Sequence, residues 1–362
     1  MKEVLRSKLQ SRKQDDSFRK LTIPEGSIDF FSNDYLGLAR EIQDIPESIN
    51  LVGSTGSRLL SGNSAEAVEA EKQLASFFNS ESALIFNSGY SANLGLLSCI
   101  PQRDDFILYD ELVHASIRDG IRLSHAKAIS FKHNDILDLQ RIIERSSGTI
   151  YIVVESLYSM DGDMAPLKGI LSIAKELNAK VIVDEAHAAG VYGFEGRGLV
   201  NGREITEDIF ARIVTFGKAY GFHGAAVLGS QELISYLINF SRPFIYTTAL
   251  PPKDYVLIKD RVIRSDIRER QIKLHDNLKY FRDKLKIDTI SEINSPIQVF
   301  EFGTKELVLQ KVKNLNEAGI YTKQIFSPTV PIGKERIRIC LHNFNTKHEI
   351  DLLINVLNLS TE

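Results

Sequence analysis

Short apolar runs alternate with amphipathic stretches between about residues 28 and 241. Most of these runs are continuously apolar, which is typical of strands that are covered on both faces. The strands predicted from them span residues 82–87, 105–110, 127–131, 149–156, 179–186, 211–216 and 225–229. Helical spacing of apolar residues separates the strands, for example over 67–78 and 167–177. This alternation predicts an α/β fold built on a mainly parallel sheet.

The N-terminal segment, residues 1–23, has the pattern of a polar helix. Val4, Leu5 and Leu9 fall on one face of this helix, and Phe18 and Leu21 follow further along. We expect the polar side to be solvated and the helix to pack on the main body of the protein.

The pattern changes after residue 250, where a long charged stretch begins. An apolar stripe with helical spacing, which predicts a helix facing the core, consists of Leu274, Leu278, Phe281 and Leu285. The remainder predicts an α+β unit with a strand at 296–302, a helix at 306–318, a short strand near Tyr321, a strand at 336–342 and a final helix. A capping box between Thr346 and Glu349 marks the start of that last helix.

These changes of pattern divide the chain into three parts. We expect an N-terminal segment over residues 1–34, a large α/β domain over 35–250 and a smaller α+β domain over 251–362. A chain of this length can bury a large core without disulfides or structural metals.

The amino-acid composition excludes several classes of protein. The 362 residues are 43% hydrophobic and 25% charged, as in ordinary soluble enzymes, and the net charge of −3 gives no reason to expect nucleic acid as a partner. The charged N-terminus has no apolar signal core, and no apolar run approaches the ~18 residues of a membrane span. The chain has only two cysteines, which excludes a disulfide framework and favours a reducing cytoplasm.

Several familiar motifs are incomplete. Residues 184–187 spell DEAH, but the glycine-rich phosphate loop that an ATPase needs is missing, because Ala219 follows Gly217 and Lys218. The chain also has no dinucleotide-binding glycine pattern, and its histidines and cysteines do not form a zinc signature. Helicase, dehydrogenase and zinc-hydrolase functions are therefore disfavoured, and no metal site is expected.

Two charged residues follow buried strands. Asp184 ends one predicted strand and Lys218 comes just after the next, where open α/β sheets bind ligands. His187 follows Asp184 by three residues. The three residue types match the needs of pyridoxal phosphate, namely a Schiff-base lysine, a carboxylate for the pyridine nitrogen and a hydrogen-bond partner for the phenolic oxygen. They are the candidate catalytic core.

A cofactor phosphate needs backbone N–H groups at a helix start. Residues 87–93 provide such a turn, and Gly89 lets the backbone approach closely. Thr215, three residues before Lys218, could add a hydroxyl to the same phosphate. His114 is a candidate for stacking on the cofactor ring.

The chain resembles the α-oxoamine synthases from about Arg19 to His342. The matching segments are FSNDYLGLA (31–39), GSTGSRLLSGN (53–63), FNSGYSAN (86–93), DELVHASIRDG (110–120), SMDGDMAPL (159–167), VDEAHAAGVYG (183–193) and TFGKAYGFHGAAVLGS (215–230). The resemblance implies a fold-type I pyridoxal-phosphate-dependent transferase of the class II aminotransferase superfamily. Such enzymes are homodimers that condense an amino acid with an acyl thioester and release carbon dioxide.

The resemblance also implies a role for each site residue. Lys218 would form the Schiff base and act as acid and base at the alpha carbon, beside Asp184, His187 and the stacking His114. The other cofactor contacts it implies are Gly89, Tyr90, Ser159, Thr215, and Thr247 or Thr248, the last pair reaching the phosphate of the partner subunit. It further assigns Arg338 to the substrate carboxylate, a task suited to a planar guanidinium, and Thr329 and Arg19 to the acyl substrate. His114 would also help to orient the incoming substrate.

Within the family, IYTTALPP (245–252), the SGN turn and SPTVPIG (327–333) are most similar to the members that join L-alanine to a pimeloyl thioester in biotin synthesis. The acyl carrier could be coenzyme A or an acyl carrier protein. The chain departs from the family pattern at Ala67, Ala188, Ala189 and Phe326. A synthase using glycine or serine, an aminotransferase of the same fold and a silent binding protein are the alternatives.

Overall fold

The computed structural model describes residues 2–14, 18–19, 21, 23, 27–41, 52–327 and 330–358. The chain divides into two compact units. The large unit comprises residues 33–159 and 163–274, and the small unit comprises residues 1–32, 160–162 and 275–362.

The large unit is built on a sheet of seven strands in its described residues, with the order β2-β8-β7-β6-β5-β3-β4. The strands are β2 (Ser82–Phe86), β3 (Phe106–Asp110), β4 (Lys127–Phe131), β5 (Ile150–Glu155), β6 (Lys180–Asp184), β7 (Ala211–Thr215) and β8 (Ala225–Gly229). Strands β7, β6, β5, β3 and β4 are mutually parallel, whereas β8 is antiparallel to both of its neighbours. The predicted α/β fold with a mainly parallel sheet is confirmed.

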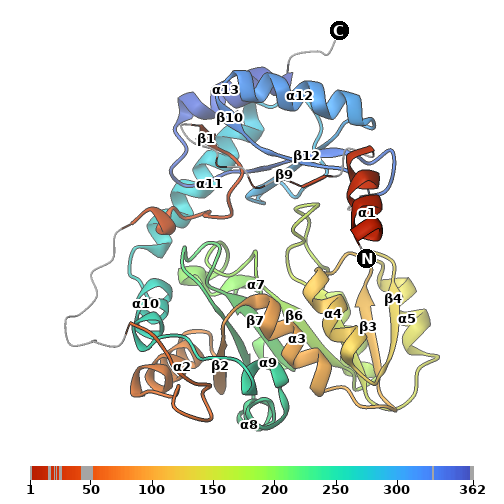
Figure 1. Cartoon of the computed structure of the whole chain (residues 1–362), viewed down its shortest axis with the longest axis vertical. Coiled ribbons are helices and arrows are strands. Elements are labelled where there is room, and N and C mark those ends of the chain that lie inside the picture. Colours follow the sequence, from red (N-terminus) through yellow and green to blue (C-terminus); the bar gives the residue numbers. More distant parts are fainter. Residues whose placement is uncertain are drawn as a thin grey trace. The chain divides into compact units, whose positions relative to one another are not determined.

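Helices cover both faces of this sheet. The helices of the large unit are α2 (Ala65–Phe77), α3 (Gly89–Cys99), α4 (Ala115–Leu123), α5 (Ile136–Ile143), α6 (Leu167–Glu176), α7 (Gly198–Gly202), α8 (Gln231–Phe240), α9 (Arg242–Ile245) and α10 (Pro252–Val262), with short 3₁₀ turns at Leu38–Arg40, Phe194–Gly196 and Thr206–Asp208. Strand β6 shows the two cores that result: Ile182 packs with α3 and α4, whereas Val181 and Val183 pack with α5 and α6. Figure 1 shows α3 and α4 side by side across one face.

The segment after residue 250 belongs to the large unit as far as Leu274, inside α11 (Ile267–Lys284). Arg261 is buried and donates to the carbonyl of Leu38, and Arg270 donates to the carbonyl of Leu36 at 3.0 Å. Gln271 donates to the carbonyl of Val191 at 2.9 Å. These bonds attach the segment to the large unit. The three-part division with limits at residues 34 and 250 stays a prediction.

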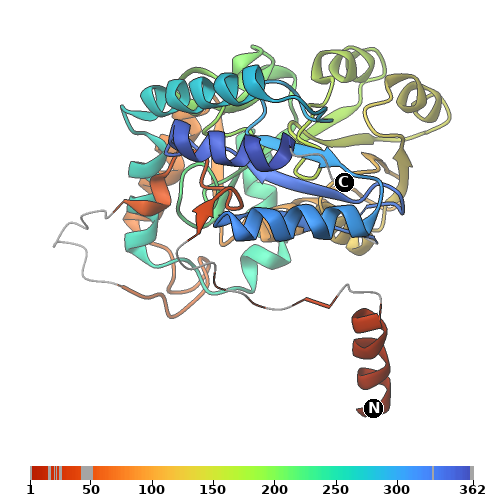
Figure 2. The ribbon, with the colours of Figure 1, turned by 90° about the horizontal axis from the view of Figure 1, so that it is seen from above.

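The small unit has an antiparallel sheet of order β11-β12-β9, formed by β11 (Lys323–Ile325), β12 (Arg336–Cys340) and β9 (Ile297–Glu301). Figure 2 shows its helices α12 (Lys305–Glu317) and α13 (Lys347–Asn358) running alongside each other. A parallel pair, β1 (Ile28–Asp29) and β10 (Ile320–Tyr321), joins the N-terminal segment to this unit. The predicted α+β character of this part is confirmed.

The N-terminal helix is shorter than the predicted span of 1–23. Helix α1 covers Lys2–Gln14, and the described residues beyond it, 18, 19, 21 and 23, are not helical. Val4, Leu5 and Leu9 are 59%, 58% and 51% exposed, and the packing of this helix on the main body stays a prediction. Helices in proteins are stabilised mostly by the packing of an apolar face, and three apolar side chains among charged ones bury too little area to stabilise a longer helix.

The predicted capping box at the start of α13 is confirmed. The backbone N–H of Thr346 donates to Glu349 Oε2 at 2.7 Å, and the backbone N–H of Glu349 donates to Thr346 Oγ1 at 3.2 Å. We expect Thr346→Ala to lower the free energy of unfolding by about 1 kcal/mol, because one helix-terminal N–H loses its acceptor. Urea unfolding checks this, with Thr346→Ser as the matched control. Equal stability of the alanine and serine variants would contradict the assignment.

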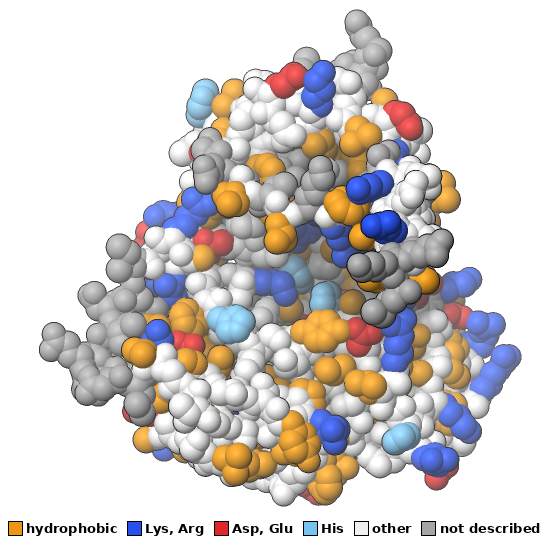
Figure 3. Space-filling view, in the orientation of Figure 1, with side chains coloured by type: hydrophobic (Ala, Val, Ile, Leu, Met, Phe, Trp, Pro, Cys, Tyr) orange, Lys and Arg blue, Asp and Glu red, His pale blue; other side chains and the backbone are white. Residues whose placement is uncertain are grey.

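The surface carries charges of both signs. Figure 3 shows acidic side chains interspersed with the basic ones on the face in view, as the net charge of −3 leads one to expect. None of the described helices combines the length and the apolar character that a bilayer crossing requires.

Candidate active site

Polar side chains gather at the carboxyl ends of the central parallel strands. Asp110 ends β3, Glu155 ends β5, Asp184 ends β6 and Thr215 ends β7. Glu155 and Asp184 are direct neighbours in the register of β5 and β6. This edge is where open α/β sheets bind ligands, and the sequence pattern predicted Asp184 and Lys218 there.

Asp184 is 5% exposed and held from two sides. Its Oδ2 accepts a hydrogen bond from Asn93 Nδ2 at 2.7 Å, and its Oδ1 accepts one from the backbone N–H of Ala186 at 2.8 Å. Asn93 lies on α3 and also donates to Ser116 Oγ at 3.1 Å. The carboxylate is therefore fixed in one orientation at the strand end.

His187 lies in the turn after β6 and is oriented by Tyr35. The Tyr35 hydroxyl and His187 Nδ1 are 2.8 Å apart, and both side chains are buried. The hydroxyl also lies 3.1 Å from its acceptor Asn33 Oδ1. This chain of contacts sets the plane of the imidazole, and it involves Tyr35, a residue that the sequence analysis did not single out.

His114 caps the start of α4. Its Nδ1 lies 2.7 Å from Ser116 Oγ, and its backbone N–H donates to Glu155 Oε1 at 2.5 Å. Burial lowers the pKa of His114, and the positive charge of Lys218 adds to this, while the charge of Asp184 opposes it. The imidazole is therefore kept neutral at neutral pH, which suits stacking on an aromatic ring. Through Ser116 and Asn93, it is linked to Asp184 by hydrogen bonds.

Glu155 is a site residue that sequence reasoning missed. It is 3% exposed, and burial, together with the negative charge of Asp184, raises its pKa well above the ordinary range. The signal that could have found it is the one that found Asp184, an acidic residue at the end of a continuously apolar strand.

Lys218 lies in the loop after β7 and is partly buried. Its carbonyl accepts from the backbone N–H of Gly221 at 2.8 Å, which closes the loop into a turn. The charge of Lys218 lowers the pKa of both His114 and Glu155, so its amine lies within electrostatic reach of each. The structure thus brings Lys218, Asp184 and His114 to one edge of the sheet.

The predicted phosphate cradle lies at the start of α3. Ser88 caps the helix by accepting from the backbone N–H of Ser91 at 3.1 Å, and a Cβ built on Gly89 would lie 3.7 Å from Thr215 Oγ1. The first turn of α3 and the Thr215 hydroxyl therefore face the same space. Tyr90 is 45% exposed and donates its hydroxyl to Asp119.

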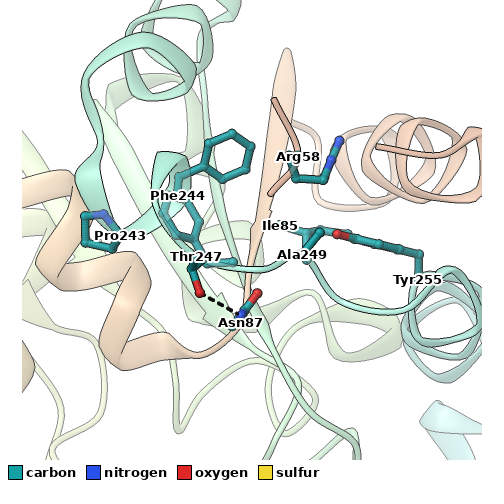
Figure 4. Close-up of a pocket in the computed structure, with 9 residues that line it drawn as sticks. Arg58, Ile85, Asn87, Pro243, Phe244, Thr247, Ala249 and Tyr255 are labelled. Carbon is teal, nitrogen blue, oxygen red and sulfur yellow. Dashed lines mark hydrogen bonds between the residues drawn. The ribbon is translucent and has the colours of Figure 1, made fainter. Parts of the chain in front are cut away.

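The loop with Thr247 and Thr248 is attached to this cradle. Asn87 Nδ2 donates to the Thr248 carbonyl at 2.9 Å and to Thr247 Oγ1 at 3.4 Å. Figure 4 shows the small pocket beside this link, with Asn87 and Thr247 joined by a dashed line and Arg58 on its far side. Arg58 is bonded to both carboxylate oxygens of Glu71, at 2.8 and 2.9 Å, so its charge is already compensated.

The remaining predicted residues lie elsewhere in the chain. Ser159 is a partly buried residue of the large unit, whereas Arg338 is a buried residue of β12 in the small unit. Arg19 is an exposed residue of the small unit's non-helical N-terminal segment. Thr329 lies outside the described residues.

The large-unit residues fit pyridoxal phosphate chemically. A buried, oriented carboxylate, two imidazoles and an amine gather at one sheet edge. A helix N-terminus with a neighbouring hydroxyl adds donors for a phosphate. Each is a group that this cofactor requires.

Comparison with known proteins agrees with this chemistry. The family model of class I and II aminotransferases matches residues 25–357. The chain belongs to this family. A curated relative, the 8-amino-7-oxononanoate synthase of Emericella nidulans, is 39% identical over 99% of this chain and 95% of its own length.

Solved structures extend the likeness to the fold. The 8-amino-7-oxononanoate synthase of Francisella tularensis is 30% identical over 92% of this chain and 97% of its own, with a TM-score of 0.77. A serine palmitoyltransferase from S. paucimobilis with a bound PLP–myriocin aldimine is 26% identical over 98% of this chain and 95% of its own, with a TM-score of 0.87.

The similarity to α-oxoamine synthases and the fold-type I assignment are therefore confirmed. This member of the class I and II aminotransferase family is a pyridoxal-phosphate-dependent enzyme. The roles of the individual site residues stay predictions.

Proposed function

We propose that this enzyme condenses L-alanine with a pimeloyl thioester to form 8-amino-7-oxononanoate, carbon dioxide and a free thiol, as a step of biotin synthesis. The observation that carries the proposal is the edge of the large-unit sheet, where Asp184, His114 and Lys218 come together. The names of relatives such as that of Emericella nidulans support the choice of substrates.

Three side chains would hold the cofactor ring. Asp184, oriented by Asn93, would accept a hydrogen bond from the protonated pyridine nitrogen, and His187, oriented by Tyr35, would form a hydrogen bond with the phenolic oxygen. The neutral imidazole of His114 would stack on the ring face. Gly89, Tyr90, Ser159 and Thr215 would surround the rest of it. When bound, pyridoxal phosphate supplies a sink for the electrons released at the amino acid's alpha carbon.

Lys218 would act as the general base and the general acid of the reaction. Its Nζ would hold the cofactor at rest, take the proton from the alpha carbon of alanine and return a proton there after decarboxylation. Arg338 would bind the alanine carboxylate through its planar guanidinium, and this anchoring would set which bond at the alpha carbon stands perpendicular to the ring. Arg19 and Thr329 would contact the acyl chain.

Two further parts of the proposal concern partners. Thr247 or Thr248 would reach the cofactor phosphate of a second copy in a homodimer, and the Asn87 bonds that hold this loop support its ordered position. The acyl group would arrive on coenzyme A or on an acyl carrier protein, in a reducing cytoplasm.

Product mass spectrometry tests this function. The purified holoenzyme is given alanine, glycine or serine with pimeloyl or palmitoyl thioester, and thiol release is followed in parallel. We expect 8-amino-7-oxononanoate from alanine with the pimeloyl donor. A preference for serine with a long acyl donor would instead support the activity named for the structural neighbour from S. paucimobilis.

A further inference from the structure

A charged cluster outside the cofactor residues centres on His133, which follows β4 by two residues. His133 Nδ1 lies 2.9 and 3.1 Å from the two carboxylate oxygens of Asp110. On the other side of the ring, Nε2 lies 2.7 Å from Asp163 Oδ2. The imidazole therefore bridges two acidic residues that come from different segments of the large unit.

This geometry requires a doubly protonated ring. Carboxylate oxygens only accept hydrogen bonds, and a neutral imidazole has one N–H, so only the imidazolium satisfies both partners. Burial acts against the charged form, but the hydrogen bonds and charges of Asp110 and Asp163 outweigh it and raise the pKa of His133 to about 10. The ring is thus a permanent cation at neutral pH.

Side chains from several segments surround the imidazole ring of His133. The edge of the ring packs against Tyr158, with ring centres 4.5 Å apart and planes at 89°. Asn134 donates through its backbone to Asp110 at 2.9 Å and through its side chain to Asp163 at 2.7 Å. The backbone N–H of His133 donates to Glu111 Oε1 at 3.1 Å, so a third carboxylate faces the cluster.

The two aspartates belong to segments that carry candidate cofactor residues. Asp110 precedes His114 by four residues, and Asp163 follows Ser159 by four residues. Asp110 is fully buried, and its Oδ1 also accepts from the backbone N–H of Leu112 at 2.8 Å, inside the turn that leads to His114. Any shift of Asp110 would therefore move the start of α4.

We propose that His133 is a positioning residue, which ties Asp110 to Asp163 and thereby sets the placement of His114 and Ser159 toward the cofactor. This proposal depends on the proposed function only through the cofactor-binding roles of His114 and Ser159. The ionic bridge of His133 does not depend on that function, so an experiment can contradict the positioning role and the proposed function separately.

His133→Gln is the first test. The glutamine leaves buried Asp110 and its partner Asp163 without a cation, so the two segments should separate. We expect the apparent Kd for pyridoxal phosphate, measured by absorbance titration, to rise about tenfold, with kcat falling more than KM changes. His125→Gln, at an exposed position of the large unit, is the matched control and should change neither quantity.

Asp163→Asn is a milder variant that keeps an oxygen acceptor and removes one charge. Nitrogen NMR of histidine-labelled protein follows the titration of His133 directly. The folded-state pKa of about 10 lies above the ordinary 6.5, so the bridge contributes stability that is fully present below pH 6.5 and lost as the pH rises through 10. We expect kcat of the wild type to fall at alkaline pH as the ring loses its proton. In the asparagine variant, the ring should lose its proton at a lower pH, and the fall in kcat should begin at that lower pH.

Three results decide between the possibilities. A wild-type His133 that titrates near pH 6.5 would overturn the bridge. His133→Gln or Asp163→Asn proteins that are merely less stable, with unchanged Kd for pyridoxal phosphate and unchanged kcat, would overturn the positioning role. A raised Kd for pyridoxal phosphate and a lowered rate of thiol release in the variants, combined with a wild type that releases thiol but forms no 8-amino-7-oxononanoate, would support the positioning role while contradicting the proposed substrates.

Discussion

Replacing Lys218 with alanine should abolish turnover and remove the visible absorbance of the bound cofactor. Lys218 is the amine assigned both to holding the cofactor and to moving the proton at the alpha carbon. Loss of the general acid and base alone is expected to cost about 10²–10⁴-fold in rate, and loss of the covalent attachment adds to that. Absorbance spectra and steady-state kinetics of the purified protein measure the two effects separately.

The matched control for this experiment is Lys175→Ala. Lys175 is an exposed lysine in the last turn of α6, on the opposite face of the sheet from α3. Its removal should leave the spectrum and kcat unchanged. Wild-type turnover in the Lys218→Ala protein would disprove the assigned mechanism, whatever the control shows.

Replacing Asp184 with asparagine should have the next largest effect. The side chain keeps its size and can keep an oxygen toward Asn93 Nδ2, so the fold should persist. The negative charge that would stabilise a protonated pyridine nitrogen is lost, and we expect kcat to fall about 10²–10³-fold, the loss typical when one preorganised electrostatic partner is removed.

This prediction is checked by kinetics together with circular dichroism of the bound cofactor. Asp208→Asn, at an exposed position of a 3₁₀ turn, is the matched control and should behave like the wild type. An Asp184→Asn enzyme with at least half of the wild-type kcat would show that the carboxylate does not face the ring.

The sequence alone was enough to predict the elements that carry the site. Strands such as β5 and β6 are buried on both faces, so each is a continuous apolar run in the sequence. The ends predicted from these runs agree with the ends in the structure to within a residue or two. Asp184 could be located because it interrupts such a run, and Thr346 because a capping box is a local motif. These features depend on short-range spacing.

Long-range contacts were not predictable in the same way. Glu155 also ends an apolar run, but only the register of β5 beside β6 shows that it adjoins Asp184. His133 was not singled out from the sequence, because its two partners, Asp110 and Asp163, come from two other segments of the large unit. The extent of α1 was mispredicted because helical spacing does not report whether an apolar face finds a surface to cover it.

The identity of the lysine that holds the cofactor is the most direct test of the account. The holoenzyme is reduced with borohydride, digested and mapped by mass spectrometry. We expect a pyridoxyl group on the peptide that contains Lys218, and on no other peptide. A pyridoxyl group on a different lysine, or unlabelled peptides from a protein that binds the cofactor, would contradict it.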